Sequence, residues 1–484
     1  METTPQHASD PASGHASGHT SGHASGQLGR GLKPRQVTMI SIGGVIGAGL
    51  FVGSSSAIAL AGPAVIIAYL AAALIVVVVM QMLGEMACAS PETGSFSSYA
   101  DRALGRWAGF SIGWLYWWFY VLVVSIEAIV AGNILGTWLG VPGWITAFAI
   151  TLALVAANCM SVNNFGELEY VLSIIKVASI VLFIILGTLA ILGLLPFSST
   201  HGWSNLLGNG GFFPKGYVAV VAALLTAMFS FQGTEVVTIA AAESAEPRRN
   251  IKKAIRAVIW RLALFYIGSM FVVICLVPWN APGLSKGSYQ AVLSAMNIPG
   301  APQIMSVVVL VAVVSCLNSA IYTASRMVYS LSTRGDAPAL LAKTSRQGVP
   351  RYAIYCTAAV ALAALAANYV LPKALFDFLL ATSGAIALLM YLVIAVTQLF
   401  MRRELLAQGK PLDVKMWCFP YLTILTIVFI LGVFVTMAIF PGFRGELAST
   451  AVLTAILVAT GFYLQKRGTP AQAMHAGRAG AIRS

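Results

Sequence analysis

Three ionisable side chains lie well inside apolar stretches of this sequence of 484 residues: Glu127, Lys176 and Glu235. A charged side chain in the middle of a membrane costs roughly 3 kcal/mol or more, so such residues usually have a functional role. Glu127 needs either a substrate amine or protein donors as partners. Burial penalises the ammonium form of Lys176, so this amine could release its proton. The chemistry that these residues suggest is charge pairing and proton transfer inside a membrane.

The segment 41–54, Ser-Ile-Gly-Gly-Val-Ile-Gly-Ala-Gly-Leu-Phe-Val-Gly-Ser, lies in the first apolar stretch and contains five glycines. Each glycine weakens a helix interior by about 1 kcal/mol relative to alanine, so we expect this helix to break near its middle. Unwound backbone at membrane depth is tolerated only where protein buries it or water reaches it. Beyond the break, unpaired N–H groups and a positive helix end suit a carboxylate. The alternative is a glycine-rich face for close helix packing.

A second interruption is expected at 229–235, Phe-Ser-Phe-Gln-Gly-Thr-Glu, where a glycine stands beside a buried carboxylate. Two interrupted helices at corresponding places in two halves of a chain are the best sequence indication of a transporter's binding site. The match between the two segments therefore favours broken helices over simple close packing.

The composition places these segments in a membrane protein. Hydrophobic residues make up 58% of the sequence, charged residues only 9%, and the mean hydropathy is +0.84, whereas soluble domains contain about 25% charged residues. The net charge of +13 comes mostly from short loops, so membrane topology explains it better than nucleic-acid binding. The six cysteines have no metal-ligand spacing and are interpreted as packing residues. No metal or cofactor site is expected.

A membrane-spanning helix needs about 20 apolar residues. The sequence predicts twelve, at approximately 38–59, 63–88, 108–136, 144–162, 170–195, 217–242, 256–277, 303–332, 352–371, 375–400, 417–440 and 447–465. With the N-terminus in the cytoplasm, inside segments hold 24 of the 29 Lys and Arg residues and outside loops hold 4. This asymmetry predicts that both termini are cytoplasmic.

The placement of the interruptions in the first and sixth spans predicts an all-α membrane domain with two inverted five-span repeats. We expect a disordered cytoplasmic tail at 1–30, where no signal peptide is evident, and one transporter domain at 31–467. Within that domain the repeats cover 38–195 and 217–400, and two further spans cover 417–465. A second cytoplasmic tail follows at 468–484.

Several motifs resemble those of amino acid permeases of the amino acid–polyamine–cation superfamily, and together they cover nearly the whole chain after the N-terminal tail. They are the glycine-rich segment 43–55, Phe-Gln-Gly-Thr-Glu-Val-Val-Thr-Ile-Ala-Ala-Ala-Glu-Ser at 231–244, the Pro-Arg-Arg-Asn-Ile-Lys-Lys stretch at 247–253, Leu-Val-Pro-Trp-Asn at 276–280, Cys-Leu-Asn-Ser-Ala-Ile-Tyr-Thr-Ala-Ser-Arg-Met at 316–327 and Arg-Gly-Asp-Ala-Pro at 334–338. Within the family, the segments 113–119 and 238–243 look most similar to bacterial γ-aminobutyrate (GABA) permeases. The resemblance implies a LeuT-type fold and proton-coupled amino acid uptake, but proline, aromatic, lysine and D-serine permeases share most of these motifs.

The resemblance also implies where a substrate binds. Its carboxylate would meet the N–H groups of Gly47, Ala48 and Gly49, and the amine of an α-amino acid would meet carbonyls near Val45, Phe229 and Gln232. Adjoining residues of the two breaks complete the expected site, with Phe229 and Phe231 as candidate lids: Ile46, Gly233 and Thr234. Aromatic residues in membrane helices are nevertheless more often packing residues.

For coupling, the resemblance implies that a fifth-span lysine such as Lys176 takes the place of the cation that joins spans one, five and eight in sodium-driven relatives. A static structural cation is the alternative. Glu235 would act near the substrate and gates, or would cap the broken backbone of the sixth helix. Polar residues of the eighth span could hydrogen-bond near Lys176 or only to neighbouring helices: Asn318, Ser319 and Thr323. Glu243 is either a cytoplasmic gate or an ordinary interface residue.

Glu127 bears on the substrate, because the ammonium of GABA lies three methylenes from its carboxylate. With the carboxylate held at Gly47 to Gly49, this ammonium must reach about 5–6 Å further into the pocket. We hypothesise that Glu127 meets it there, with pairing to protein donors as the alternative.

The sequence is therefore interpreted as a proton-coupled symporter that imports an amino acid, with GABA as the expected substrate, across the bacterial inner membrane by alternating access. A permease for proline, aromatic or other neutral amino acids, and a nutrient sensor without transport, remain alternatives. A membrane enzyme is disfavoured because we find no metal cluster, catalytic triad or paired carboxylates in the sequence. A channel fits two broken helices around a closed site less well.

Overall fold

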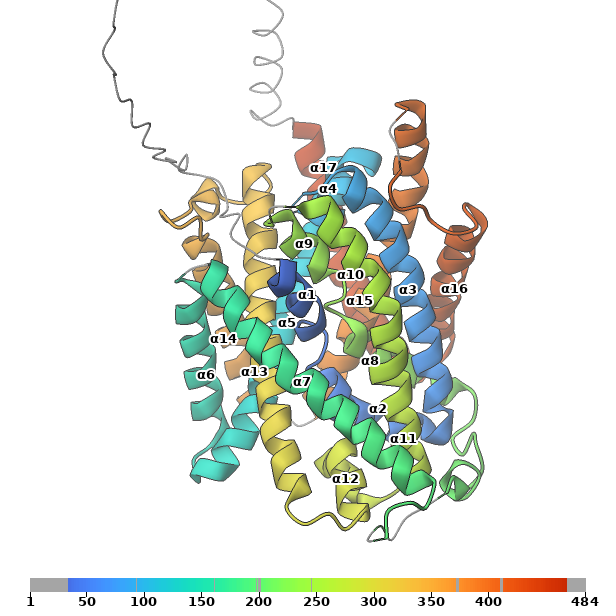
Figure 1. The fold of residues 1–484 in the computed structure, drawn as a ribbon. Helices are drawn as coiled ribbons and strands as arrows, with labels where there is room; N and C mark the ends of the chain where they lie inside the picture. Colours follow the sequence, from blue (N-terminus) through green and yellow to red (C-terminus); the bar gives the residue numbers. More distant parts are fainter. Residues whose placement is uncertain are drawn as a thin grey trace, which may run out of the picture.

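The computed structural model describes residues 34–92, 94–160, 162–196, 198, 202–244, 246–370, 374–409 and 412–467, and the expected tails at 1–30 and 468–484 lie outside these residues. Within the described residues the polypeptide forms a bundle of helices (Figure 1). The α-helices are α1 (Pro34–Gly43), α2 (Ser54–Ala61), α3 (Val65–Ala89), α4 (Ser95–Leu104), α5 (Arg106–Leu139), α6 (Gly143–Asn158), α7 (Val162–Ile191), α8 (Val218–Phe231), α9 (Val236–Ala242), α10 (Pro247–Arg261), α11 (Ser269–Leu276), α12 (Ser288–Ala295), α13 (Ala301–Thr333), α14 (Arg351–Val370), α15 (Ala374–Ala407), α16 (Tyr421–Ile439) and α17 (Arg444–Arg467).

Two short elements are π-helical and continue neighbouring α-helices: η1 (Gly49–Gly53) leads into α2, and η4 (Leu262–Gly268) joins α10 to α11. The other short elements are turns of 3₁₀-helix: η2 (Gly62–Ala64), η3 (Ser204–Leu206), η5 (Pro282–Lys286), η6 (Ala339–Ala342) and η7 (Pro441–Phe443). Single-turn π-helical segments inside α-helices often mark functional sites. Here η1 follows directly on the glycine-rich interruption expected from sequence.

Eight helical stretches in the described residues are long and apolar enough to cross a membrane, and three shorter apolar helices accompany them. The twelve predicted hydrophobic stretches follow these eleven helices in order, but the first two share the single stretch Gly49–Ala89, and several helices extend beyond their predicted limits. For example, α10 begins at Pro247 rather than near 256, and α15 continues to Ala407 rather than 400. These extensions are rich in Lys and Arg, so a hydropathy window does not include them although they continue the helix.

The central helices are those that bury most of their surface. In the most apolar part of α5, 83% of the residues are buried, and the same fraction is buried in the interrupted pair α8 and α9. In the most apolar parts of α7 and α16, only 28% of the residues are buried. α5 packs on α13 and α4, α8 packs on α2, α3 and α15, and α1 packs on α7. A helix that exposes apolar side chains is suited to lipid contact, so α7 and α16 lie at the rim and α5 and α8 form the interior.

The helix bundle has two opposite ends, which can be followed in Figure 1. The C-terminal end of α17, α4 and the turn between α9 and α10 lie together at the top of the view, and we call this end the terminal face. α12 and the end of α11 lie at the opposite face.

Candidate substrate site

The first interruption lies between Gly43, where α1 ends, and the helical turn that begins at Ala48 and continues as η1. Residues 44–47 are not helical, which confirms the break expected from the glycines. The chain resumes helical form with the N–H groups of Leu50 and Phe51 both directed at the carbonyl of Gly47, at 3.2 and 3.4 Å. The backbone N–H and C=O groups of residues 44–47 therefore lie outside any helix, in the protein interior.

The second interruption follows Phe231, the last residue of α8, and α9 begins at Val236. Gln232 is extended and Gly233 has a φ of +103°, a region that residues with a Cβ rarely adopt. A Cβ at Gly233 would also lie 2.1 Å from the carbonyl oxygen of Gly44. Glycine is therefore required here both by the backbone conformation and by the approach of the first break.

The two interrupted helices are in direct backbone contact at further points. A Cβ on Gly49 would lie 2.6 Å from the Cα of Ser230, and the Ser230 hydroxyl donates to the Gly49 carbonyl at 2.7 Å. The Tyr266 hydroxyl lies 2.8 Å from the Val45 carbonyl and 2.7 Å from the Ser230 carbonyl. Tyr266 belongs to η4, and sequence reasoning missed it because a tyrosine in an apolar helix has no distinctive spacing.

Glu235 caps the second break. One carboxylate oxygen accepts hydrogen bonds from the hydroxyls of Tyr116 and Tyr120, both at 3.0 Å, and the other accepts from the N–H of Gly233 at 3.1 Å. The side chain is buried. The capping role that the sequence left open is therefore present in the geometry, while a gating role stays a prediction.

Glu127 lies at the first break. Both of its carboxylate oxygens are 3.0 Å from the backbone nitrogen of Ala48, and the side chain is buried. A Cβ on Gly47 would lie 2.4 Å from Glu127 Oε1 and 2.8 Å from the Sγ of Cys316. The carboxylate therefore rests on the N–H that the substrate carboxylate was expected to use. In this conformation it does not lie deeper in the pocket, where a GABA ammonium was expected.

Lys176 joins three parts of the bundle. Its Nζ donates to the hydroxyl of Ser315 on α13 at 2.7 Å and to the carbonyl of Ile46 in the first break at 3.3 Å, and it lies 3.6 Å from the carboxylate of Glu169 on α7. The Ser315 hydroxyl also hydrogen-bonds to Glu169. Lys176 and Glu169 are both fully buried. The lysine thus takes the position between the first, fifth and eighth predicted spans that the resemblance implied.

Sequence analysis missed Glu169 because the predicted fifth span began at residue 170. A signal was nevertheless available, since Glu169 and Lys176 are seven residues apart and therefore lie on one face of a helix, two turns from each other. The span-eight residues that were expected near Lys176 make other contacts. Asn318 accepts a hydrogen bond from Asn158 at 2.7 Å, and Thr323 donates to the carbonyl of Ser319 within its own helix at 2.8 Å.

The side chains at the second break divide into packing and polar groups. Phe231 packs between Tyr69 and Tyr266, at ring-centroid distances of 5.9 and 4.4 Å, and Phe229 lies 6.5 Å from Phe119. Gln232, in contrast, is buried with neither its amide oxygen nor its amide nitrogen hydrogen-bonded to protein, as far as the described residues show. A buried polar group without a protein partner is costly, so such a group often faces a ligand or water.

Near the terminal face, a buried ion pair joins α13 to the turn after α9. The guanidinium of Arg326 lies 3.2 Å from the carboxylate of Glu243 and 3.9 Å from the ring centroid of Tyr322, which stacks on Phe165 at 4.2 Å. Arg326 lies within α13, and only 1% of its surface is exposed. This cluster joins the end of α9 to α13 and α7.

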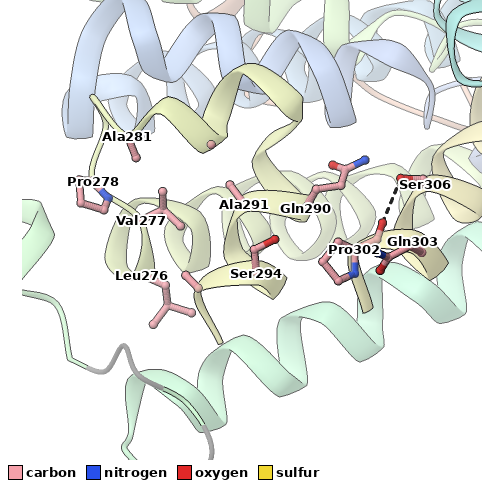
Figure 2. A pocket seen from close by; sticks show the side chains of 12 residues that line it. Leu276, Val277, Pro278, Ala281, Gln290, Ala291, Ser294, Pro302, Gln303 and Ser306 are labelled. Carbon is pink, nitrogen blue, oxygen red and sulfur yellow. Dashed lines mark hydrogen bonds between the residues drawn. The ribbon is translucent and has the colours of Figure 1, made fainter. Parts of the chain in front are cut away.

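Two cavities open near the opposite face. One, of about 600 Å³, lies between α2, α5 and the η5 segment, and Ser55, Asn133 and Trp279 contribute to its wall. The other, of about 640 Å³, lies between the end of α11, α12 and the start of α13 (Figure 2). In Figure 2 the side chains of Gln290 and Ser294 on α12 line this second cavity. Neither cavity wall includes residues of the two interruptions.

Comparison with known proteins agrees with this arrangement. The family model described as amino acid permease matches residues 36–468. A protein described as a probable GABA permease of Pseudomonas aeruginosa is 55% identical over 443 residues, covering 91% of this chain and 93% of that protein. The γ-aminobutyric acid permease of Escherichia coli is 54% identical over 436 residues, covering 90% and 94%. An aromatic amino acid transport protein of Corynebacterium glutamicum is 42% identical, covering 90% and 95%.

Among solved structures, a manganese transporter of Eremococcus coleocola shares the fold with a TM-score of 0.58 and 12% sequence identity, covering 92% of this chain and 97% of that chain. At that identity the likeness concerns the arrangement of helices only. The match to the family model over nearly the whole described chain, with relatives above 50% identity, carries the assignment. This multi-pass membrane protein, with two interrupted helices in backbone contact, belongs to the amino acid permease family of transporters.

Proposed function

We propose that the protein is a proton-coupled symporter that imports GABA across the bacterial inner membrane by alternating access. The choice of GABA as the substrate rests on the sequence identity of 55% and 54% to two proteins described as GABA permeases. The interrupted helices, with backbone donors in the interior and Lys176 between them and α13, support transport with a titratable group beside the site.

The proposal includes twelve membrane spans in a LeuT-type arrangement. The segments 38–195 and 217–400 form two inverted five-span repeats, and 417–465 adds two spans. The position of the two breaks, in the first and sixth of these spans, supports this division. The terminal face is the cytoplasmic face, because the exposed Lys and Arg residues of α10 lie there.

In the proposed site, the substrate carboxylate is bound by N–H groups of Gly47, Ala48 and Gly49. The amine side is formed by carbonyls and side chains of the second break, where Gln232 offers an amide without a protein partner. In the conformation described, Glu127 occupies the Ala48 N–H, so it can reach a GABA ammonium only after leaving that donor.

Lys176 and Glu235 are the proposed coupling and gating residues. GABA is a zwitterion at neutral pH, so import with one proton moves one net charge. Through about 100 mV this releases about 2.3 kcal/mol, which sustains roughly 50-fold accumulation before any pH gradient is added. The buried Arg326–Glu243 pair, which joins α13 to the turn after α9, is the proposed gate at the terminal face.

The test is uptake of labelled GABA into proteoliposomes with an acid-outside pH gradient, with no gradient, and with a protonophore. We expect concentrative uptake only with the gradient. Competition by proline and by aromatic amino acids is measured in parallel, because a relative transporting aromatic substrates is 42% identical. Stronger uptake of one of these would reassign the substrate, gradient-independent uptake would remove proton coupling, and binding without flux would indicate a sensor.

A further inference from the structure

The contact between Glu127 and the first break has the form of a bound carboxylate. Its two oxygens are equidistant from the Ala48 nitrogen, at 3.0 Å, and no side chain separates it from the backbone because residue 47 is glycine. This is the donor at which the carboxylate of an amino acid substrate is proposed to bind. A side chain of α5 thus takes the place of the substrate's own carboxylate.

We propose that Glu127 is a tethered competitor of the substrate, which binds the Ala48 N–H when the site is closed to substrate and must leave it for the substrate carboxylate to bind. This inference rests on the proposed function only in that the substrate has a carboxylate. One N–H cannot serve two carboxylates at once. Two carboxylates side by side also repel each other, so a substrate enters more readily when Glu127 has taken up a proton.

A comparison of the two breaks separates this role from simple capping. Glu235 at the second break is held by three donors, the N–H of Gly233 and the hydroxyls of Tyr116 and Tyr120. Glu127 is held by the N–H of Ala48 and by the thiol of Cys316, which is a weak hydrogen-bond donor. A carboxylate with one strong donor is released more easily than a carboxylate with three. Glu127 is therefore better suited than Glu235 to leave its break and return to it.

Three other titratable side chains surround Glu127. The titratable side chains that face it from the packed elements are Lys176 on α7, Cys316 on α13 and Tyr266 on η4. Lys176 is also bound to the carbonyl of Ile46, two residues before Ala48. Its positive charge favours ionised Glu127 at the break when no substrate is present. When Glu127 is protonated, the Lys176 ammonium can instead attract the carboxylate of the substrate.

The proton is taken from solution by the Glu127 carboxylate, which becomes a neutral carboxylic acid, and no covalent bond of the substrate changes. Substrate binding and proton uptake are then linked. Above the pH at which Glu127 ionises, the affinity for a carboxylate ligand falls about tenfold per pH unit, because one proton must be taken up for each ligand bound.

The experiment measures binding of GABA, n-butyrate and n-butylamine to the purified full-length protein between about pH 5 and pH 9. Glu127→Gln is compared with wild type, and Glu235→Gln is the capping control. We expect Glu127→Gln to bind butyrate at least as tightly as wild type at low pH and roughly tenfold or more tightly at high pH, with no pH dependence. We expect Glu235→Gln to lose affinity by a similar factor at every pH.

A loss of GABA affinity in Glu127→Gln at every pH, with butyrate unaffected, would instead make Glu127 a partner of the ammonium and overturn the proposal. If Glu127→Gln does not fold, the proposal is tested with the wild-type protein alone. Proton uptake on ligand binding is then measured in a weakly buffered solution that contains a pH-sensitive dye. Binding of GABA or butyrate should then take up protons and binding of butylamine should not, and carboxylate binding without proton uptake contradicts the proposal. If wild type binds another amino acid in place of GABA, the substrate assignment fails, and the same titration with that amino acid still tests Glu127.

Discussion

Replacement of Gly49 by alanine should disable transport while leaving the protein folded. The new Cβ would lie 2.6 Å from the Cα of Ser230 and 3.0 Å from its hydroxyl. Carbon atoms pack at about 3.5–4.0 Å, so the two interrupted helices must separate by roughly 1 Å. The atom in the way is backbone of α8, which cannot rotate aside as a side chain could.

The expected size of the effect follows from these contacts. Overpacking of this kind costs about 1–3 kcal/mol, and separation also weakens the hydrogen bond from Ser230 to the Gly49 carbonyl, worth about 1 kcal/mol. Each 1.4 kcal/mol is a factor of ten, so we expect a loss of roughly 10- to 100-fold or more in uptake efficiency. Gly49→Val, with two further methyl groups, should abolish uptake.

Gly53→Ala is the matched control. It lies in the same π-helical element, but its Cβ would have no neighbour nearer than 3.7 Å, which is ordinary contact. We expect it to transport as wild type. Uptake into proteoliposomes is normalised to the amount of inserted protein, and thermal unfolding in detergent checks the fold. Normal uptake by Gly49→Ala, or an equal loss in Gly53→Ala, would refute the idea that close backbone contact of the two breaks forms the site.

Four further changes test other contacts. Lys176→Ala should remove proton-driven accumulation but retain exchange of internal for external substrate, and unchanged accumulation under a pH gradient would count against coupling by this lysine. Glu169→Gln should lower accumulation by roughly tenfold with exchange retained, since a charge-assisted contact contributes about 1.5–3 kcal/mol; equal losses of exchange and accumulation would indicate a merely structural role. Tyr266→Phe should lower both the melting temperature and substrate affinity, because it leaves the Val45 and Ser230 carbonyls without the one hydroxyl that they share, at about 1–3 kcal/mol; a variant indistinguishable from wild type in both measurements would contradict this. Glu243→Gln should destabilise the protein by about 3–5 kcal/mol by leaving Arg326 unpaired, and an unchanged melting temperature would show that the pair is not closed in the membrane.

Much of this protein could be predicted from local sequence. Apolar stretches and glycine clusters act within one helix, so the order of the helices and both interruptions were predictable from propensity and length alone. The burial of Glu127 followed from the same logic, because an ionisable residue in the middle of a membrane helix must face the protein interior. The family motifs supplied the class of function in the same local way.

The partners of these residues depended on tertiary structure. The contact of Gly233 with Gly44 and that of Glu127 with Ala48 join residues 189 and 79 positions apart, and no pattern within either helix encodes the rotation that brings them together. The sequence indicated that Glu127 needs a partner but left open a substrate amine or a protein donor. The packing of α5 against the first break decided for a backbone N–H in this conformation, because glycine at position 47 leaves room for a carboxylate to reach it.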